Sequence, residues 1–160
     1  MKQILIFFCM IFASCTFEYD EPNGLQGDTI KFSKKELSFS AQGGLDTVTS
    51  QGIFWWIASS MSIDGKRYGF MLEDSRFYHF KTEDGENYVK DEDEGEIFVA
   101  EYSNADIKKL EGAWFTVDKA TKQMLTFAVA PNATGNIRTL SFGVEAGNYG
   151  TNIRVTQAAE

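Results

Sequence analysis

Histidine and cysteine are scarce in this chain of 160 residues, which has one histidine and two cysteines. A single histidine excludes a zinc site built from three histidines. Any serine–histidine–aspartate triad would have to use His79, yet no nucleophile motif lies near that residue. We therefore predict that His79 is a partly buried structural residue, and that the protein is not an enzyme and needs no metal or cofactor.

The chain also lacks an apolar run long enough to span a membrane, which takes roughly 20 residues. Its longest apolar run lies within residues 1–14. There Lys2 precedes a hydrophobic segment of about ten residues, which is followed by small residues. This pattern is typical of a secretory signal peptide, which is removed during export.

The end of this leader resembles the lipobox of bacterial lipoproteins. Its residues are Phe12-Ala13-Ser14-Cys15, with Phe12 where the motif usually has leucine. The resemblance implies that Cys15 becomes the first residue of the mature protein and carries acyl chains that anchor it in a membrane. Because Cys9 lies in the leader, the mature protein would have no disulfide and no cysteine metal ligand.

Residues 15–28 are rich in glycine and acids and are predicted to form a flexible, acylated tether. Glu18, Asp20 and Glu21 resemble the signal that sends lipoproteins of some Gram-negative bacteria to the outer face of the outer membrane. An ordinary solvated linker would have the same composition. The expected location is the outer membrane, with the protein lipid-anchored and exposed at the cell surface.

Basic residues are outnumbered, with 15 lysines and arginines against 23 aspartates and glutamates and a net charge of −8. Such a chain repels phosphate backbones, so nucleic acid is not an expected partner.

Residues 29–160 are predicted to form one all-β domain. Short segments alternate apolar and polar residues between glycine or Asn/Asp turns, such as Gly43-Gly44 and Asp64-Gly65, which favours an antiparallel sandwich. Residues 104–110, followed by Gly112, are predicted to be one short helix. The residues expected in the core are Ile53, Trp55, Ile57, Trp114, Leu125, Phe127, Val129, Leu140, Phe142, Val144, Ile153 and Val155.

Five segments in order resemble a BACON domain, a Bacteroidetes-associated module that often binds carbohydrate. They are FSAQGGLDTVTS (39–50), the tryptophan pair 55–56, AWFTVD (113–118), VAPNATGNIRTLSF (129–142) and IRVTQ (153–157). The resemblance implies an immunoglobulin-like sandwich of about seven strands. The chain departs from the family pattern at residues 61–112, where it has a long insertion in place of a short link.

Aromatic residues recur in this insertion, which we expect to form an extra hairpin or two packed on the sandwich. Tyr68, Tyr78 and Tyr88 are candidate carbohydrate-binding residues, because a tyrosine ring can stack on the apolar face of a sugar. The alternative is that these rings form the local core of the insertion. The acidic run 88–96 fits a calcium loop poorly and is interpreted as a solvated turn.

The tryptophan pair is divided by strand geometry. If Trp55 faces the core, then Phe54 and Trp56 face outward, since successive strand residues point to opposite sides. Trp56 is therefore a further candidate carbohydrate-binding residue, unless the insertion covers it.

Three functions fit these features. The protein could bind a glycan such as a polysaccharide or mucin, bind protein as an adhesin or an accessory subunit of a surface complex, or act as a spacer. Carbohydrate binding is the leading hypothesis, and it depends on the family resemblance.

Overall fold

The computed structural model describes residues 30–52, 54–82, 88–91, 96–103 and 106–160. The predicted signal peptide, Cys15 and the tether lie outside these residues.

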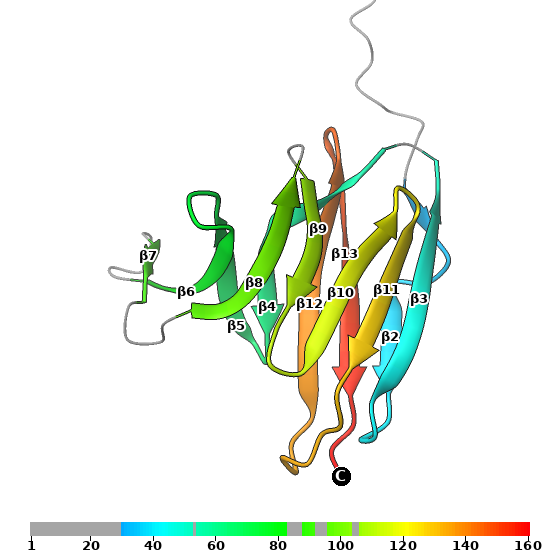
Figure 1. The fold of residues 1–160 in the computed structure, drawn as a ribbon, viewed down its shortest axis with the longest axis vertical. Coiled ribbons are helices and arrows are strands. Elements are labelled where there is room, and N and C mark those ends of the chain that lie inside the picture. Colours follow the sequence, from blue (N-terminus) through cyan, green and yellow to red (C-terminus); the bar gives the residue numbers. More distant parts are fainter. Residues whose placement is uncertain (1–29, 53, 83–87, 92–95, 104–105) are drawn as a thin grey trace, which may run out of the picture.

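The described residues form thirteen β-strands and no helix. Hydrogen bonds join the strands in the order β1-β3-β11-β10-β9-β8-β6-β5-β4-β12-β13-β2, with β7 beside β6. This path folds over into two layers, with β3, β11, β10 and β9 in front and β4, β12, β13 and β2 behind (Figure 1). The predicted all-β sandwich is confirmed. The strands are β1 (Lys31–Phe32), β2 (Glu36–Phe39), β3 (Gly44–Gln51), β4 (Trp56–Ile63), β5 (Lys66–Met71), β6 (Arg76–Thr82), β7 (Tyr88–Lys90), β8 (Glu96–Ser103), β9 (Asp106–Glu111), β10 (Phe115–Thr121), β11 (Met124–Val129), β12 (Arg138–Ala146) and β13 (Tyr149–Gln157).

The strands outside the insertion have the arrangement of an immunoglobulin sandwich. One layer contains β1-β3-β11-β10 and the other β4-β12-β13, which are the two strand orders of that fold. β2 extends the second layer and pairs with β13 in parallel. The prediction of an antiparallel sandwich is therefore right except at this edge. Because β1 and β2 lie in different layers, they do not form a hairpin of their own.

The insertion supplies β5 to β9 and joins the two layers along one side (Figure 1). β5 pairs with β4, β9 pairs with β10, and β6 pairs with β8 between them. Asp64 and Gly65 connect β4 to β5 with φ angles of 49° and 83°, as a tight two-residue hairpin turn requires. The predicted extra hairpins are thus confirmed, as β5–β6 and β8–β9.

The predicted helix at residues 104–110 is wrong. Residues from Asp106 onward form β9, which is hydrogen-bonded to β8 on one side and to β10 on the other. Ile107 and Leu110 are both buried, and their spacing of three residues imitated one face of a helix. A helix this short is marginal by itself, whereas two neighbouring strands satisfy the backbone of the same segment.

A β-bulge explains how residues three apart can share a face of β9. Tyr102 on β8 pairs with Ile107, and the preceding Glu101 pairs with Lys109, so Lys108 is an extra residue on β9. The bulge shifts the alternation by one residue, so Ile107 and Leu110 lie on the same face.

The core between the layers follows the predicted alternation. Phe127 on β11 and Phe142 on β12 stack across it with ring centroids 6.2 Å apart. Ile53 lies outside the described residues, and the other predicted core residues are all buried: Trp55, Ile57, Trp114, Leu125, Phe127, Val129, Leu140, Phe142, Val144, Ile153 and Val155.

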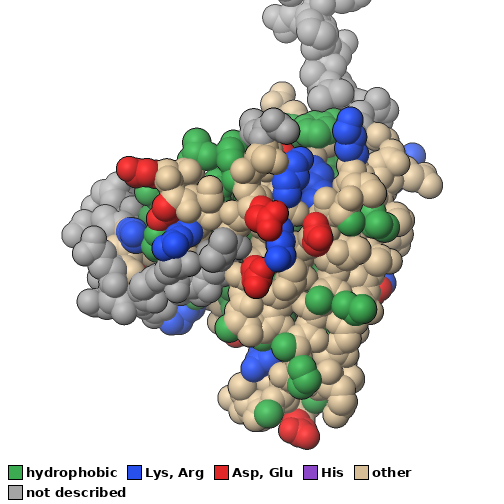
Figure 2. Space-filling view, in the orientation of Figure 1, with side chains coloured by type: hydrophobic (Ala, Val, Ile, Leu, Met, Phe, Trp, Pro, Cys, Tyr) green, Lys and Arg blue, Asp and Glu red, His purple; other side chains and the backbone are tan. Residues whose placement is uncertain are grey.

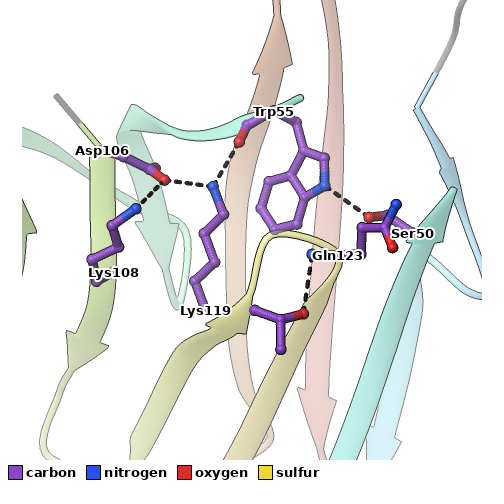
Figure 3. Close-up of polar contacts among 7 residues, drawn as sticks. Ser50, Trp55, Asp106, Lys108, Lys119 and Gln123 are labelled. Carbon is purple, nitrogen blue, oxygen red and sulfur yellow. Dashed lines mark hydrogen bonds and ion pairs between the residues drawn. The ribbon is translucent and has the colours of Figure 1, made fainter. Parts of the chain in front are cut away.

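A buried ion pair connects β9, β10 and the segment that enters β4 (Figure 3). The side chains of Lys119 and Asp106 are each 2% exposed, and Lys119 Nζ lies 2.6 Å from Asp106 Oδ2. Lys119 Nζ also donates to the carbonyl oxygen of Trp55 at 2.6 Å and lies 4.2 Å from the centre of that indole ring. Burial lowers the pKa of Lys119, and the hydrogen bond to Asp106 acts in the opposite direction.

The indole of Trp55 is held on its other side by two further contacts. Its Nε1 donates to Ser50 Oγ at 2.8 Å (Figure 3). The ring of Phe32 meets the indole edge-on at a centroid distance of 5.6 Å. With Trp55 fixed inward, the alternation of the chain places Phe54 and Trp56 on the outer side.

Removing Asp106 should destabilise the protein strongly, because Lys119 would keep a buried charge without its partner. We expect Asp106→Ala to lower the free energy of unfolding by about 3–5 kcal/mol. The double variant Asp106→Leu/Lys119→Met should recover much of that loss, since it replaces the pair by apolar groups. Urea unfolding followed by tryptophan fluorescence measures both variants. A double variant less stable than Asp106→Ala would contradict this role of the pair.

Gly43 and Gly135 offer a matched test of the predicted Gly-Gly turn, with φ angles of 70° and 72°. A β-carbon on Gly43 would lie 2.1 Å from the carbonyl oxygen of Val129, whereas one on Gly135 would meet no atom within 4 Å. Gly135→Ala should cost about 1–2 kcal/mol of stability from backbone strain. Gly43→Ala should cost clearly more, because the backbone must also shift. Thermal unfolding compares the two, and equal losses would be evidence against this packing.

Candidate functional site

Two aromatic rings lie on the outer side of the segment that enters β4. Phe54 is 58% exposed and Trp56 is half-buried, with ring centroids 6.3 Å apart. Trp55 between them is buried, so the predicted division of the tryptophan pair is confirmed. The outward rings form an apolar platform on a rigid support, since the buried contacts of Trp55 hold the backbone beneath them.

A carboxylate stands beside this platform. Glu145 on β12 lies opposite Trp56 in the pairing of β12 with β4, and Trp56 Nε1 donates to Glu145 Oε2 at 3.2 Å. Glu145 is exposed, and a carboxylate can accept about four hydrogen bonds. It therefore fixes the indole and retains acceptor capacity for a ligand.

Trp56 forms one wall of a groove of about 310 Å³. The opposite wall comes from the insertion, where Phe70 on β5 packs against Tyr102 on β8 at a centroid distance of 5.4 Å. Leu72, which follows β5, is 61% exposed at the same groove. The insertion thus flanks Trp56 without enclosing it. The lining residues are Trp56, Ile57, Ser59, Phe70, Leu72, Tyr102, Ile107 and Glu145.

The other predicted binding residues do not join Trp56 in this groove. Tyr68 and Tyr78 are 5% and 6% exposed, so neither ring offers a free face for stacking. Tyr68 packs against His79 with centroids 5.5 Å apart, and Lys90 Nζ lies 3.5 Å from the centre of the Tyr78 ring. For these two residues the alternative of a local core is right. The side chain of Tyr88 lies outside the part of the chain that the structure describes.

His79 is half-buried on β6, as predicted for a structural histidine, and its Nδ1 lies 3.5 Å from Asp91 Oδ2. Residues 92–95, the centre of the acidic run interpreted as a solvated turn, lie outside the described residues. Within the described ranges, no group of three or more histidine, cysteine, aspartate or glutamate side chains could hold a metal ion. The same ranges contain no helix with the length and apolar character needed to cross a bilayer.

Several residues of the groove were not singled out from the sequence. Phe70 and Tyr102 belong to the recurring aromatic residues of the insertion, which are evident in the sequence. That pattern did not show which of these residues line a groove and which lie in the core. Glu145 carried no local signal, because its position beside Trp56 depends on the register between two strands that are far apart in the sequence.

No family model and no curated protein match this chain. Among solved structures, it is similar to a protein from Bacteroides thetaiotaomicron determined by NMR, with 23% sequence identity and a TM-score of 0.53. The similarity covers 89% of this chain and 97% of that one. At this level of identity the similarity shows the fold alone. The resemblance to BACON domains therefore stays a prediction.

Proposed function

We propose that this protein is a non-catalytic lipoprotein of the bacterial cell surface that binds carbohydrate in the Trp56 groove. The observation that carries the proposal is the pairing of an outward indole with the exposed carboxylate of Glu145, which lie opposite each other in register.

The chemistry of the groove suits a sugar. A sugar ring has an apolar C–H face that packs on aromatic rings, and Phe54 and Trp56 supply such a surface. Sugar hydroxyls need hydrogen-bond partners at the edge of that surface, which Glu145 and the hydroxyl group of Tyr102 can provide. The volume lies at the lower end of the range for small-molecule sites, roughly 300–1,000 Å³, so one or two sugar units would fit.

The composition of the groove supports binding without catalysis. Glycoside hydrolysis generally uses two carboxyl groups, one as acid and one as base or nucleophile. Among the described residues that line the groove, Glu145 is the one carboxylate.

The proposed location depends on the N-terminal residues. The lipobox-like Phe12-Ala13-Ser14-Cys15 is the basis for an acyl anchor, and the acids that follow are the basis for export to the outer face. A module held at the cell surface by a tether would meet polysaccharides outside the cell.

Protein binding, by an adhesin or an accessory subunit, is the second candidate. The exposed Leu72 beside Trp56 favours it, because an apolar pocket lined by aromatic rings also accepts an anchoring side chain of a protein partner.

Binding to neutral and acidic polysaccharides, measured by isothermal titration calorimetry with the full chain in detergent, tests the leading proposal. We expect Trp56→Ala to weaken binding about 5- to 30-fold, which corresponds to about 1–2 kcal/mol for the loss of one stacking ring. Glu145→Gln should weaken it less, because the amide keeps one acceptor.

Leu45→Ala is the matched control, since Leu45 is 85% exposed but lies outside the groove. A folded Trp56→Ala variant that binds as well as the wild type would rule out this site. Absence of binding to any polysaccharide would favour a protein partner.

Replacing Cys15 tests the anchor. Cys15→Ala should abolish incorporation of labelled palmitate and leave the protein out of the membrane fraction, because no thiol is left to be acylated at that position. Fractionation of cells that express each form measures the change, and Cys9→Ala serves as the control. Continued acylation of the Cys15→Ala variant would contradict the proposal.

A further inference from the structure

A second hollow of about 240 Å³ is lined in part by Phe54. It lies near the groove, because the Phe54 ring is 6.3 Å from the ring of Trp56, which lines the groove. A ligand that stacks on Trp56 and Phe54 would therefore reach both. The residues that line the hollow are Phe54, Asp106, Lys108, Lys119, Thr121 and Lys122.

The hollow is positively charged although the whole chain carries a net charge of −8. Three lysines face one aspartate, and both Lys119 and Lys108 donate to the same Oδ2 atom of Asp106, at 2.6 and 2.7 Å. One carboxylate cannot neutralise two ammonium groups, and Lys122 adds a third at the β10–β11 hairpin. Figure 2 shows basic side chains gathered over the upper ends of β9 and β10.

The lysines differ in what they can offer a ligand. Lys119 is enclosed and bonded to Asp106 and to the carbonyl oxygen of Trp55. Lys108 is partly exposed, and its contact with Asp106 uses one of its three N–H donors. Lys122 is exposed. Lys108 lies two residues after Asp106 on β9, and both residues line this hollow.

Asp106 limits the hollow on one side. Its Oδ1 atom is buried, and among the described residues it has no hydrogen-bond partner. A ligand in the hollow therefore meets the lysines that line it rather than this buried oxygen.

We propose that this hollow binds the anionic group, a carboxylate or a sulfate ester, of an acidic glycan whose ring stacks on Phe54 and Trp56. Lys108 and Lys122 contact the anion, and Lys119 adds its charge from below. The inference rests on the proposed function and specifies its ligand class. It also gives a role to a basic hollow on an acidic protein. Without such a hollow, the negative charge of the protein would repel an anionic polymer.

A glycan array with matched neutral, carboxylated and sulfated versions of the same backbones tests the proposal, with the full chain as probe. We expect the acidic versions to bind more strongly than the neutral ones, and the preference to shrink as ionic strength rises. Lys122→Gln should weaken acidic binding about three- to five-fold, as expected for one partly solvated ion pair, and leave neutral binding unchanged. Comparing the carboxylated with the sulfated arm identifies the anion.

Lys35→Gln is the control for net charge, because Lys35 is exposed on the segment between β1 and β2 and lines neither site. Lys122→Gln removes no contact with the core, so loss of folding does not obscure the result. Equal binding of neutral and acidic glycans, or equal effects of the two lysine variants, would overturn the inference and leave the proposed function in place. Absence of binding to every glycan would overturn both.

Discussion

The buried ion pair between Lys119 and Asp106 is the contact on which the arrangement of the candidate site depends. It links a strand of the sandwich, β10, to a strand of the insertion, β9, and its lysine also binds the backbone of Trp55. Two charges taken out of water are held in place by one another, because neither can move without losing its partner. The segment that presents Phe54 and Trp56 is thereby fixed from below.

The insertion converts an ordinary sandwich face into a groove. In an immunoglobulin-like sandwich, the outer face of the strand that carries Trp56 would be open to solvent. Here the insertion joins the two layers, and its residues Phe70, Leu72 and Tyr102 line a groove together with Trp56. Other aromatic residues of the insertion serve its own packing, since Tyr68, Phe77 and Tyr78 are buried.

The local charge of the surface depends on which strands are neighbours in the sheet, as well as on the number of charged residues in the chain. The chain is acidic overall, yet lysines from β9 and the β10–β11 hairpin meet in one hollow because those elements are neighbours in the sheet. Lys108 and Asp106 are two residues apart on β9, and their side chains meet in this hollow. A count of charged residues cannot reveal such a local reversal of sign.

The sequence by itself determined the fold class, the core residues and the orientation of the tryptophan pair. These follow from the two-residue period of strands and from glycine turns, which are local properties. It failed at β9, where a bulge placed Ile107 and Leu110 on one face and imitated a helix. Only the tertiary structure decided that Tyr68 and Tyr78 are buried, that Glu145 stands beside Trp56, and that three lysines share a hollow. Each of these depends on register between strands distant in the chain, and no local pattern specifies that register.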